Sequence, residues 1–148
     1  MVKRKSECPI NYSLEIFGDN WTLLIIRDIM FFDKSCYGDF YQSAEGIATN
    51  ILADRLRFLV SEKILKKLVS PKNKSKFIYR LTKKGIDLMP TVLDLVEWGA
   101  KYNRDTFPKE FMIWLRKDRE GLMKHYREKA KISPVNSISK PQKDQRKN

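Results

Sequence analysis

The sequence has few of the residues on which metal binding, thiol chemistry and membrane insertion depend. It contains one histidine, His125, and two cysteines, Cys8 and Cys36, which are too few for a disulfide framework. No hydrophobic run reaches the roughly 18 residues of a membrane-spanning helix, and the opening stretch, MVKRKSECPI, lacks the apolar core of a signal peptide. These absences predict a cytoplasmic protein with no metal, no cofactor and no membrane partner.

The same scarcity disfavours an enzyme. A catalytic thiol needs a base to activate it, and the lone His125 lies in a basic helix far along the chain, where we expect a plain surface residue. The sequence also has no glycine-rich phosphate-binding loop. A thiol-dependent enzyme that uses Cys8 or Cys36 is therefore the third and weakest of three functional hypotheses.

Positive charge, in contrast, is abundant and unevenly distributed. The formal net charge is +12, yet residues 12–71 carry 7 basic and 8 acidic side chains. Residues 72–84 carry 6 basic side chains and no acidic one, and residues 101–148 carry 14 basic and 6 acidic ones. A near-neutral body with a dense basic stretch is typical of a protein that holds a polyanion at a defined place. A solvated lysine run is the alternative explanation.

The segment 46–65, GIATNILADRLRFLVSEKIL, has the hydrophobic spacing of a helix. One side gathers Ile47, Ile51, Leu52, Leu56, Leu59 and Val60. The other side holds Asn50, Ala53, Asp54, Arg57 and Ser61, which are short or forked polar groups around one small residue. Ordinary surface helices carry long lysine and glutamate side chains there. The pattern therefore predicts a face that contacts something other than water.

The remaining elements follow from hydrophobic periodicity and from turn residues. Thr82 is a suitable N-cap for the helix that follows the hairpin, and Pro90 should kink that helix or mark its true start. The segment 132–148 lacks periodicity and should be disordered. We expect helices at 12–17 (closed by Gly18), 21–32 (capped by Asn20 and buried), 37–42, 83–102 and 108–131, and a β-hairpin of strands 64–69 and 76–81.

Two helices joined by a tight glycine-containing turn and followed by a basic hairpin form the winged helix-turn-helix plan. The predicted class is α+β, mainly α, with about 148 residues in one main domain. A recognition helix presents small groups to base edges in the major groove, and a basic wing contacts phosphate. The predicted DNA contacts are Tyr37, Thr49, Asn50, Ala53, Asp54, Arg57, Lys72, Lys74 and Lys76. A winged-helix module that binds protein or RNA is the second hypothesis.

Several motifs, in this order and spacing, carry a family resemblance. They are Cys8-Pro9, Gly18 to Ile26, Gly46 to Leu52, Arg55 to Leu59, Tyr79 to Gly85, and Trp98-Gly99. Over residues 8–102 the chain resembles HxlR-type transcriptional regulators, a bacterial winged-helix family related to the MarR group. The resemblance implies operator binding as a dimer, through helices that flank the winged core.

The chain departs from the family pattern at several positions. Asn20 replaces a lysine, Cys36 replaces an arginine, and Lys74-Ser75 stand where the wing usually has prolines. Ala48 replaces a serine or threonine N-cap, at a cost of ~1 kcal/mol. Lys63 replaces a glycine that ends the recognition helix, and a left-handed conformation there would cost a similar ~1 kcal/mol. These departures bear on the DNA sequence that is bound and on the wing, not on the fold.

The expected organisation is a basic flank (1–7), a winged helix-turn-helix domain (8–106), a C-terminal helix for dimerisation (107–131) and a basic tail (132–148). A homodimer formed by the C-terminal helices and residues 8–18 would bind an inverted repeat with half-sites about one helical turn apart. Its expected interface residues are Trp98, Phe107, Phe111, Trp114, Leu115 and Leu122.

Cys8 has two interpretations. It is either a small apolar filler at the interface between subunits or a sensor of an oxidant or electrophile, because some members of the resembling family use their N-terminal cysteine in this way. Lys3, Arg4 and Lys5 favour its thiolate, and Glu7 opposes them. The identity of any small-molecule or oxidant effector stays open.

Overall fold

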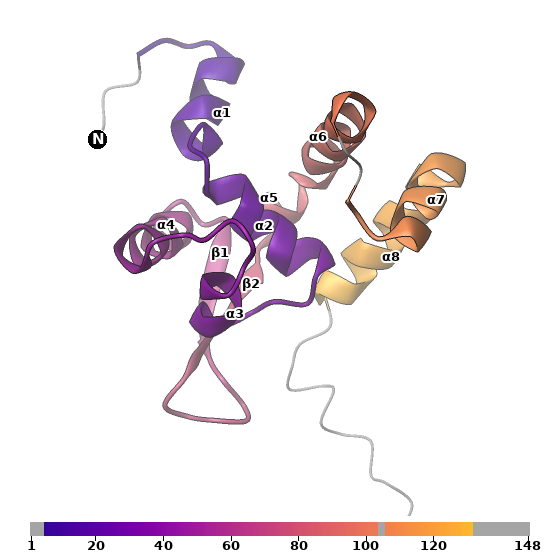
Figure 1. Cartoon of the computed structure of the whole chain (residues 1–148). Coiled ribbons are helices and arrows are strands. Elements are labelled where there is room, and N and C mark those ends of the chain that lie inside the picture. Colours follow the sequence, from indigo (N-terminus) through magenta and orange to yellow (C-terminus); the bar gives the residue numbers. More distant parts are fainter. Residues whose placement is uncertain (1–4, 104–105, 132–148) are drawn as a thin grey trace, which may run out of the picture.

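The computed structural model describes residues 5–103 and 106–131, and helices dominate it (Figure 1). The sheet in this part of the chain is a two-stranded antiparallel hairpin. The predicted α+β, mainly helical winged-helix class is confirmed, whereas the predicted tail 132–148 lies outside the described residues. The elements are α1 (Pro9–Phe17), α2 (Thr22–Phe31), α3 (Tyr37–Tyr41), α4 (Thr49–Ser61), β1 (Leu65–Val69), β2 (Phe77–Leu81), α5 (Lys83–Ile86), α6 (Met89–Tyr102), α7 (Lys109–Lys117) and α8 (Arg119–Lys131).

Helix α2 is central, and the other elements surround it (Figure 1). Its apolar side chains are buried, as predicted, but its cap is Asp19 and not Asn20. The Asp19 carboxylate accepts hydrogen bonds from the N–H groups of Trp21 (2.8 Å) and Thr22 (2.9 Å). A carboxylate at this position satisfies free N–H groups and interacts favourably with the helix dipole. Asn20 lies exposed one residue too close to the helix.

Helices α3 and α4 form the predicted helix-turn-helix, but α4 is shorter than the hydrophobic pattern suggested. It begins at Thr49, because Gly46 adopts φ +68° in the turn and Ala48 is extended. Ile47 is buried before the helix starts, where it anchors the turn to the core. Ala48 makes no side-chain capping bond, so the N-terminus of α4 lacks the usual cap.

Helix α4 ends at the lysine that replaces the expected glycine. Lys63 has φ +58°, the left-handed conformation that the sequence indicated. The Ile64 N–H donates to the Leu59 carbonyl (3.0 Å), and the Lys63 N–H donates to the Val60 carbonyl (3.0 Å). This pair of bonds is a Schellman motif, which normally places glycine at the left-handed position.

The hairpin pairs β1 with β2 from Leu65↔Leu81 to Val69↔Phe77, which confirms the prediction. The Tyr79 N–H donates to the Ser35 carbonyl (2.7 Å), so the connection between α2 and α3 lies along the free edge of β2. This bond attaches the hairpin to the helix-turn-helix.

The expected continuous helix 83–102 is wrong, since the chain forms two helices there. Thr82 caps the short α5 as predicted, with its hydroxyl accepting from the Gly85 N–H (3.2 Å). Pro90 lies in the first turn of α6, and therefore marks a helix start. Gly85 packs so closely that a Cβ atom would lie 2.5 Å from the Ile64 carbonyl oxygen.

The expected single helix 108–131 is also wrong. Asp118 is extended (φ −151°, ψ 75°) and separates α7 from α8, and its carboxylate accepts from the Gly121 N–H (2.9 Å). The two helices pack against each other and against α2, where the rings of Phe31 and Phe111 lie 5.1 Å apart. Three side chains that were expected at a subunit interface are consequently buried in this core: Phe111, Leu115 and Leu122.

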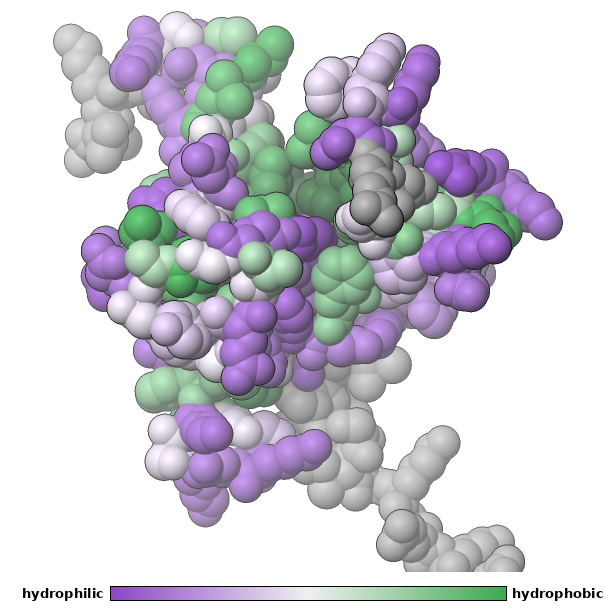
Figure 2. Space-filling model, in the orientation of Figure 1, coloured by the Kyte–Doolittle hydropathy of each residue, from purple (hydrophilic) through white to green (hydrophobic). Residues whose placement is uncertain are grey.

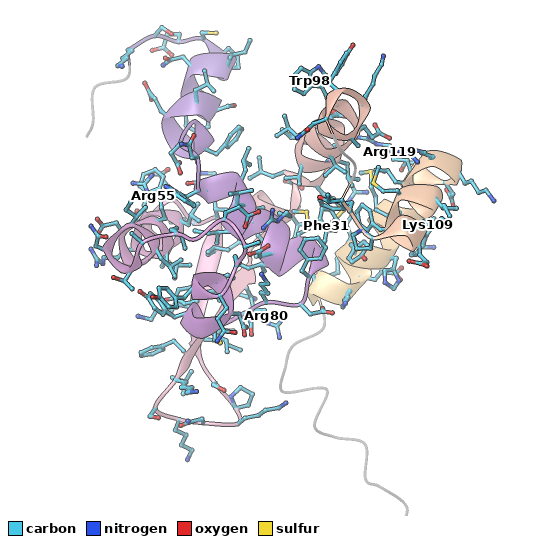
Figure 3. All side chains as sticks on the ribbon, in the orientation of Figure 1. Phe31, Arg55, Arg80, Trp98, Lys109 and Arg119 are labelled. Atoms are coloured by element: carbon cyan, nitrogen blue, oxygen red, sulfur yellow. The ribbon has the colours of Figure 1, made fainter. Side chains whose placement is uncertain are left out.

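Ion pairs attach the C-terminal hairpin to the rest of the fold. Arg119 contacts Asp94 (2.7 Å), Glu97 (2.9 Å) and the Pro90 carbonyl (3.0 Å), all on α6 (Figure 3). Lys129 on α8 contacts Asp33, after α2, at 2.6 Å. Within the described part of the chain, no helix is long and apolar enough to cross a membrane.

Candidate nucleic-acid interface

The predicted contact face of α4 is exposed. Thr49, Asn50, Asp54 and Arg57 are exposed and Ala53 is half-buried, because Leu52, Leu56 and Leu59 occupy the opposite side in the core. Arg57 Nη1 contacts the Asp54 carboxylate at 3.0 Å. Both side chains are largely exposed, and such pairs contribute little to stability, so this pair can open when another acceptor is present.

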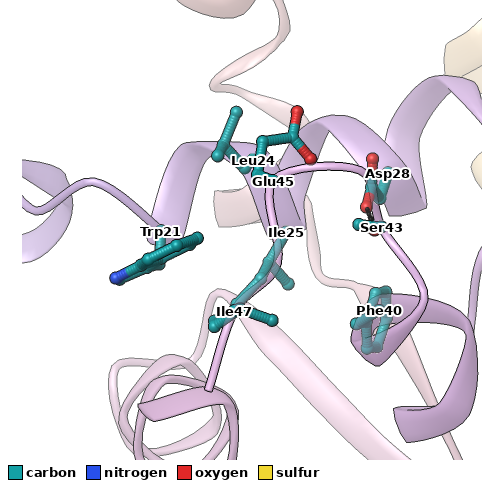
Figure 4. Close-up of a pocket in the computed structure, with 8 residues that line it drawn as sticks. All are labelled: Trp21, Leu24, Ile25, Asp28, Phe40, Ser43, Glu45 and Ile47. Carbon is teal, nitrogen blue, oxygen red and sulfur yellow. Dashed lines mark hydrogen bonds between the residues drawn. The ribbon is translucent and has the colours of Figure 1, made fainter. Parts of the chain in front are cut away.

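A buried carboxylate fixes the turn between α3 and α4 to α2. Asp28 accepts hydrogen bonds from Arg27 (2.7 Å), Lys34 (3.2 Å) and the Ser43 hydroxyl (2.6 Å), as the close-up shows for Ser43 (Figure 4). Arg27 also binds Glu45 in the turn (2.6 Å), and this hydrogen bond lowers the pKa of Glu45. The recognition helix therefore has a defined orientation relative to the core.

Tyr37 joins the two helices of the motif. Its hydroxyl donates to the Thr49 carbonyl oxygen (3.0 Å), in the first turn of α4. Asp39 holds the start of α3, since its carboxylate accepts from the N–H groups of Ser35 (2.9 Å) and Cys36 (3.1 Å). Burial would raise the pKa of Asp39, but these hydrogen bonds outweigh it and lower the pKa.

The wing lysines are exposed on the connection between β1 and β2. Lys72 and Lys74 lie at the tip, and Lys76 lies where the chain returns to β2. Asn73 organises the tip: its side-chain oxygen accepts from the Ser75 N–H (3.1 Å), and its carbonyl accepts from the Lys76 N–H (2.9 Å). A shaped tip therefore replaces the prolines that are usual in the family.

The wing and the recognition helix meet around Tyr79. Burial raises the pKa of Tyr79, and the nearby positive charge of Arg57 partly offsets that rise. Tyr79 also lines a groove with Tyr37 and Lys76. The fold thus brings Tyr37, Arg57 and Lys76 together, while Lys72 and Lys74 lie farther out on the hairpin.

The sequence prediction missed residues on the strands of the wing. Lys66 and Lys67 are exposed on β1, and the Lys67 ammonium lies 4.1 Å from the centre of the Phe77 ring. Phe77 is 48% exposed. The signal was present in the sequence, because hairpin pairing places Lys67 opposite Tyr79, next to the Val69↔Phe77 pair.

A second surface, remote from these lysines, is apolar. Leu95, Trp98 and Tyr102 of α6 are exposed, and α1 exposes Ile10 and Leu14. A groove of about 670 Å³ lies between α6 and α2 and is lined by Leu23, Leu24, Val92, Val96 and Phe107 among others. Figure 2 shows hydrophobic atoms at the bottom of the hollow between α1 and α6.

The two cysteines lie in different places. Cys8 is exposed at the N-cap of α1, whereas Cys36 is half-buried at the N-cap of α3. Both are free thiols. His125 is exposed, with its ring 5.2 Å from that of Trp114. No cluster of three metal-ligating side chains occurs in residues 5–103 and 106–131.

The chain has recognisable relatives among bacterial regulators. An uncharacterized HTH-type transcriptional regulator of Mycobacterium tuberculosis H37Rv is 33% identical over 93 residues, which are 63% of this chain and 58% of that protein. The chain therefore spans less than two thirds of that relative. The HTH-type transcriptional regulator YodB of Bacillus subtilis is 28% identical over 96 residues, which are 64% of this chain and 85% of YodB.

Solved structures agree. PA1607, a candidate transcription factor, superposes with a TM-score of 0.61 at 36% identity over 72% of this chain and 70% of its own. The reduced form of the redox regulator HypR gives a TM-score of 0.57 at 28% identity, over 64% of this chain and 92% of its own. The model of the HxlR-like helix-turn-helix family matches residues 16–107. This protein belongs to the HxlR-like helix-turn-helix family of transcriptional regulators.

Proposed function

We propose that the protein regulates transcription by binding a specific double-stranded operator as a homodimer. The observation that carries this proposal is the placement of the exposed α4 face beside the basic wing. Both surfaces meet around Tyr79, and the buried Asp28 network holds α4 in a fixed orientation. A rigid polar helix next to a cationic hairpin suits a major groove and the phosphates that flank it.

The two surfaces divide the work of recognition. Asn50 is exposed and carries the donor and acceptor that match adenine, while Arg57 suits guanine once it leaves Asp54. Lys72, Lys74 and Lys76 supply charge to the phosphates, which gives salt-dependent affinity without sequence preference. Thr49, Ala53 and Tyr37 allow close approach at the N-terminal end of α4.

Binding to short nucleic acids of each kind tests this proposal. The upstream region of the gene, as a labelled duplex, should bind with an affinity that falls steeply with salt. Single-stranded DNA and double-stranded RNA of the same sequence should bind at least about tenfold more weakly. Equal affinity for all three would support an RNA- or protein-binding module instead, and failure to bind any duplex would refute the proposal.

We propose that the apolar surface of α1 and α6 forms the dimer. Ile10 is 69% exposed and Trp98 is 67% exposed, and the adjacent groove can receive a helix from a second copy. Residues 107–131 contribute less than expected, since α7 and α8 bury most of their large side chains within the monomer. Sedimentation at micromolar concentration should give a dimer for the wild type, and a monomer for Trp98→Glu or Leu95→Glu. A monomeric wild type would contradict this.

We further propose that Cys8 responds to oxidants. Two observations support this: its thiol is exposed at the start of α1, and the similar protein HypR is described as a redox regulator. A disulfide or adduct there would alter the seating of α1 and hence the spacing of the two recognition helices. Diamide should lower operator affinity in wild type and Cys36→Ser, but not in Cys8→Ser. An unchanged wild type, or an equal change in Cys8→Ser, would assign Cys8 to packing.

A further inference from the structure

An apolar groove lies between the start of α3 and the returning strand of the wing. Its volume is about 430 Å³, and it is lined by Cys36, Tyr37, Gly38, Lys76, Phe77 and Tyr79. Both of its neighbours are proposed DNA contacts: Arg57 of α4 lies near Tyr79, and the lysine-bearing tip follows Lys76. The groove is thus continuous with the proposed interface.

The wall formed by α3 is held in place and has an open side. The Tyr37 hydroxyl is bonded to the Thr49 carbonyl, so its ring is fixed beside α4. At Gly38 nothing lies within 4 Å of the position that a Cβ atom would occupy. The nearest acid in the sequence, Asp39, points back to the N–H groups of Ser35 and Cys36. The groove lining therefore contains no carboxylate.

The wall formed by the hairpin combines an aromatic ring with positive charge. Phe77 is 48% exposed, and the Lys67 ammonium lies 4.1 Å from its ring centre. Lys76 follows on the same edge. In Figure 2 the tip of the hairpin is hydrophilic, and a band of hydrophobic atoms lies directly above it. An exposed apolar strip bordered by cations matches a chain of sugars and phosphates.

We propose that this groove seats one strand of the DNA backbone. A deoxyribose packs against Phe77 and Tyr37, and the adjoining phosphates meet Lys67 and Lys76. This inference rests on the proposed function, and it assigns Phe77, Lys67 and Gly38 to the interface in addition to the residues predicted from the sequence. Because every nucleotide carries the same sugar, contacts in the groove position the protein on the duplex without reading its sequence.

The apolar contact has its own measurable behaviour. Loss of a lysine contact reduces the slope of log affinity against log salt by about 0.9 per phosphate. Loss of Phe77 removes buried apolar area and releases no counterion, so the slope should not change. Phe77→Ser should weaken every duplex about three- to tenfold, as expected for the exposed half of a phenylalanine side chain.

Leu68 supplies the matched control. It pairs with Ile78, one register position from Phe77, and therefore points to the opposite face of the hairpin. Fluorescence anisotropy at several salt concentrations should show wild-type affinity for Leu68→Ser, reduced affinity with an unchanged slope for Phe77→Ser, and a reduced slope for Lys67→Ala and Lys76→Ala. Thermal melting of each variant separates loss of contact from loss of fold.

Filling the groove provides a test that does not destabilise the protein. Gly38→Leu places a side chain in open space and improves helix propensity, so the melting temperature should hold or rise. It should nevertheless weaken duplex binding about tenfold or more, while Gly38→Ala stays within about twofold of wild type. Wild-type affinity in both Gly38→Leu and Phe77→Ser would overturn the inference and leave the proposed function standing. A wild type that binds no duplex would refute the proposed function itself.

Discussion

Replacing Asp28 by alanine should lower the free energy of unfolding by about 3 to 4 kcal/mol, because it leaves buried cations without their anion. The Asp28 side chain is 2% exposed and receives Arg27 at 2.7 Å, Lys34 at 3.2 Å and the Ser43 hydroxyl at 2.6 Å. Hydrogen bonds to a charged group contribute about 1.5 to 3 kcal/mol each.

Two features keep the cost below the sum of these bonds. Arg27 retains Glu45 at 2.6 Å, and the Lys34 side chain is 28% exposed, so water can replace part of its lost contact. Asp28→Asn keeps an acceptor oxygen but loses the charge, and it should cost about half as much. The control is Asp54→Ala, whose pair with Arg57 is exposed and should be worth less than about 0.5 kcal/mol.

Urea unfolding, followed by tryptophan fluorescence, measures these differences at pH 7. The order of stability should be wild type and Asp54→Ala, then Asp28→Asn, then Asp28→Ala. If Asp28→Ala unfolded within about 1 kcal/mol of wild type, the network would not be holding the turn before α4. The reasoning on the orientation of the recognition helix would then fail.

The remaining predictions concern the ends of the helices and the ion pairs. Lys63→Gly should raise the free energy of unfolding by about 1 kcal/mol, since it relieves a left-handed lysine (φ +58°); a lower urea midpoint would refute this. Asp19→Ala should cost about 1 to 2 kcal/mol in the same assay, through loss of the α2 cap, whereas Asn20→Ala should be neutral. Hydrogen bonds depress the folded-state pKa of Glu45, and those to Asp19 outweigh the opposing effect of burial. Their stabilisation is therefore present above the unfolded pKa of about 4 and is lost as pH falls through the lower folded values, so urea midpoints should fall below about pH 4.5, and less steeply in Glu45→Gln. Arg119→Met should lower stability by about 1 to 2 kcal/mol, with partial rescue by lysine; an unchanged melting temperature would show that its three acceptors on α6 do not hold the C-terminal hairpin.

The sequence pattern predicted most of the winged core, because its elements depend on local rules. The hydrophobic spacing from Leu52 to Leu59 and the Thr82 cap act over a few residues. The turn residues between β1 and β2 are equally local. Even the left-handed Lys63 could be anticipated, since the Schellman geometry follows from the end of a helix and tolerates a lysine at modest cost.

What the sequence did not predict depends on tertiary contacts. Phe111, Leu115 and Leu122 keep helical spacing across Asp118, so no periodicity marks the break between α7 and α8. The break is favoured because both helices can then cover α2. Asp19 and Asn20 are both good caps by composition, and only the start of α2 at Thr22 decides between them.

The candidate site was predicted as separate pieces. The exposed α4 residues and the wing lysines follow from helix period and charge. Phe77 and Lys67 do not, because an aromatic residue in a strand is usually buried, and its exposure here is visible only in the folded hairpin. The groove also needs Gly38, whose open side cannot be inferred from a glycine in a short helix.

The central claim is that α4 reads bases and the wing contacts phosphate. Selection of bound sequences from a randomised duplex library, with wild type, Asn50→Ala and Lys74→Ala, tests it most directly. Asn50→Ala should lose preference at one position in each half-site and weaken the best sequence by about 1 to 3 kcal/mol. Lys74→Ala should select the same sequences as wild type, bind all of them more weakly, and reduce the salt slope by about one unit. A changed preference in Lys74→Ala, with an unchanged preference in Asn50→Ala, would contradict the account.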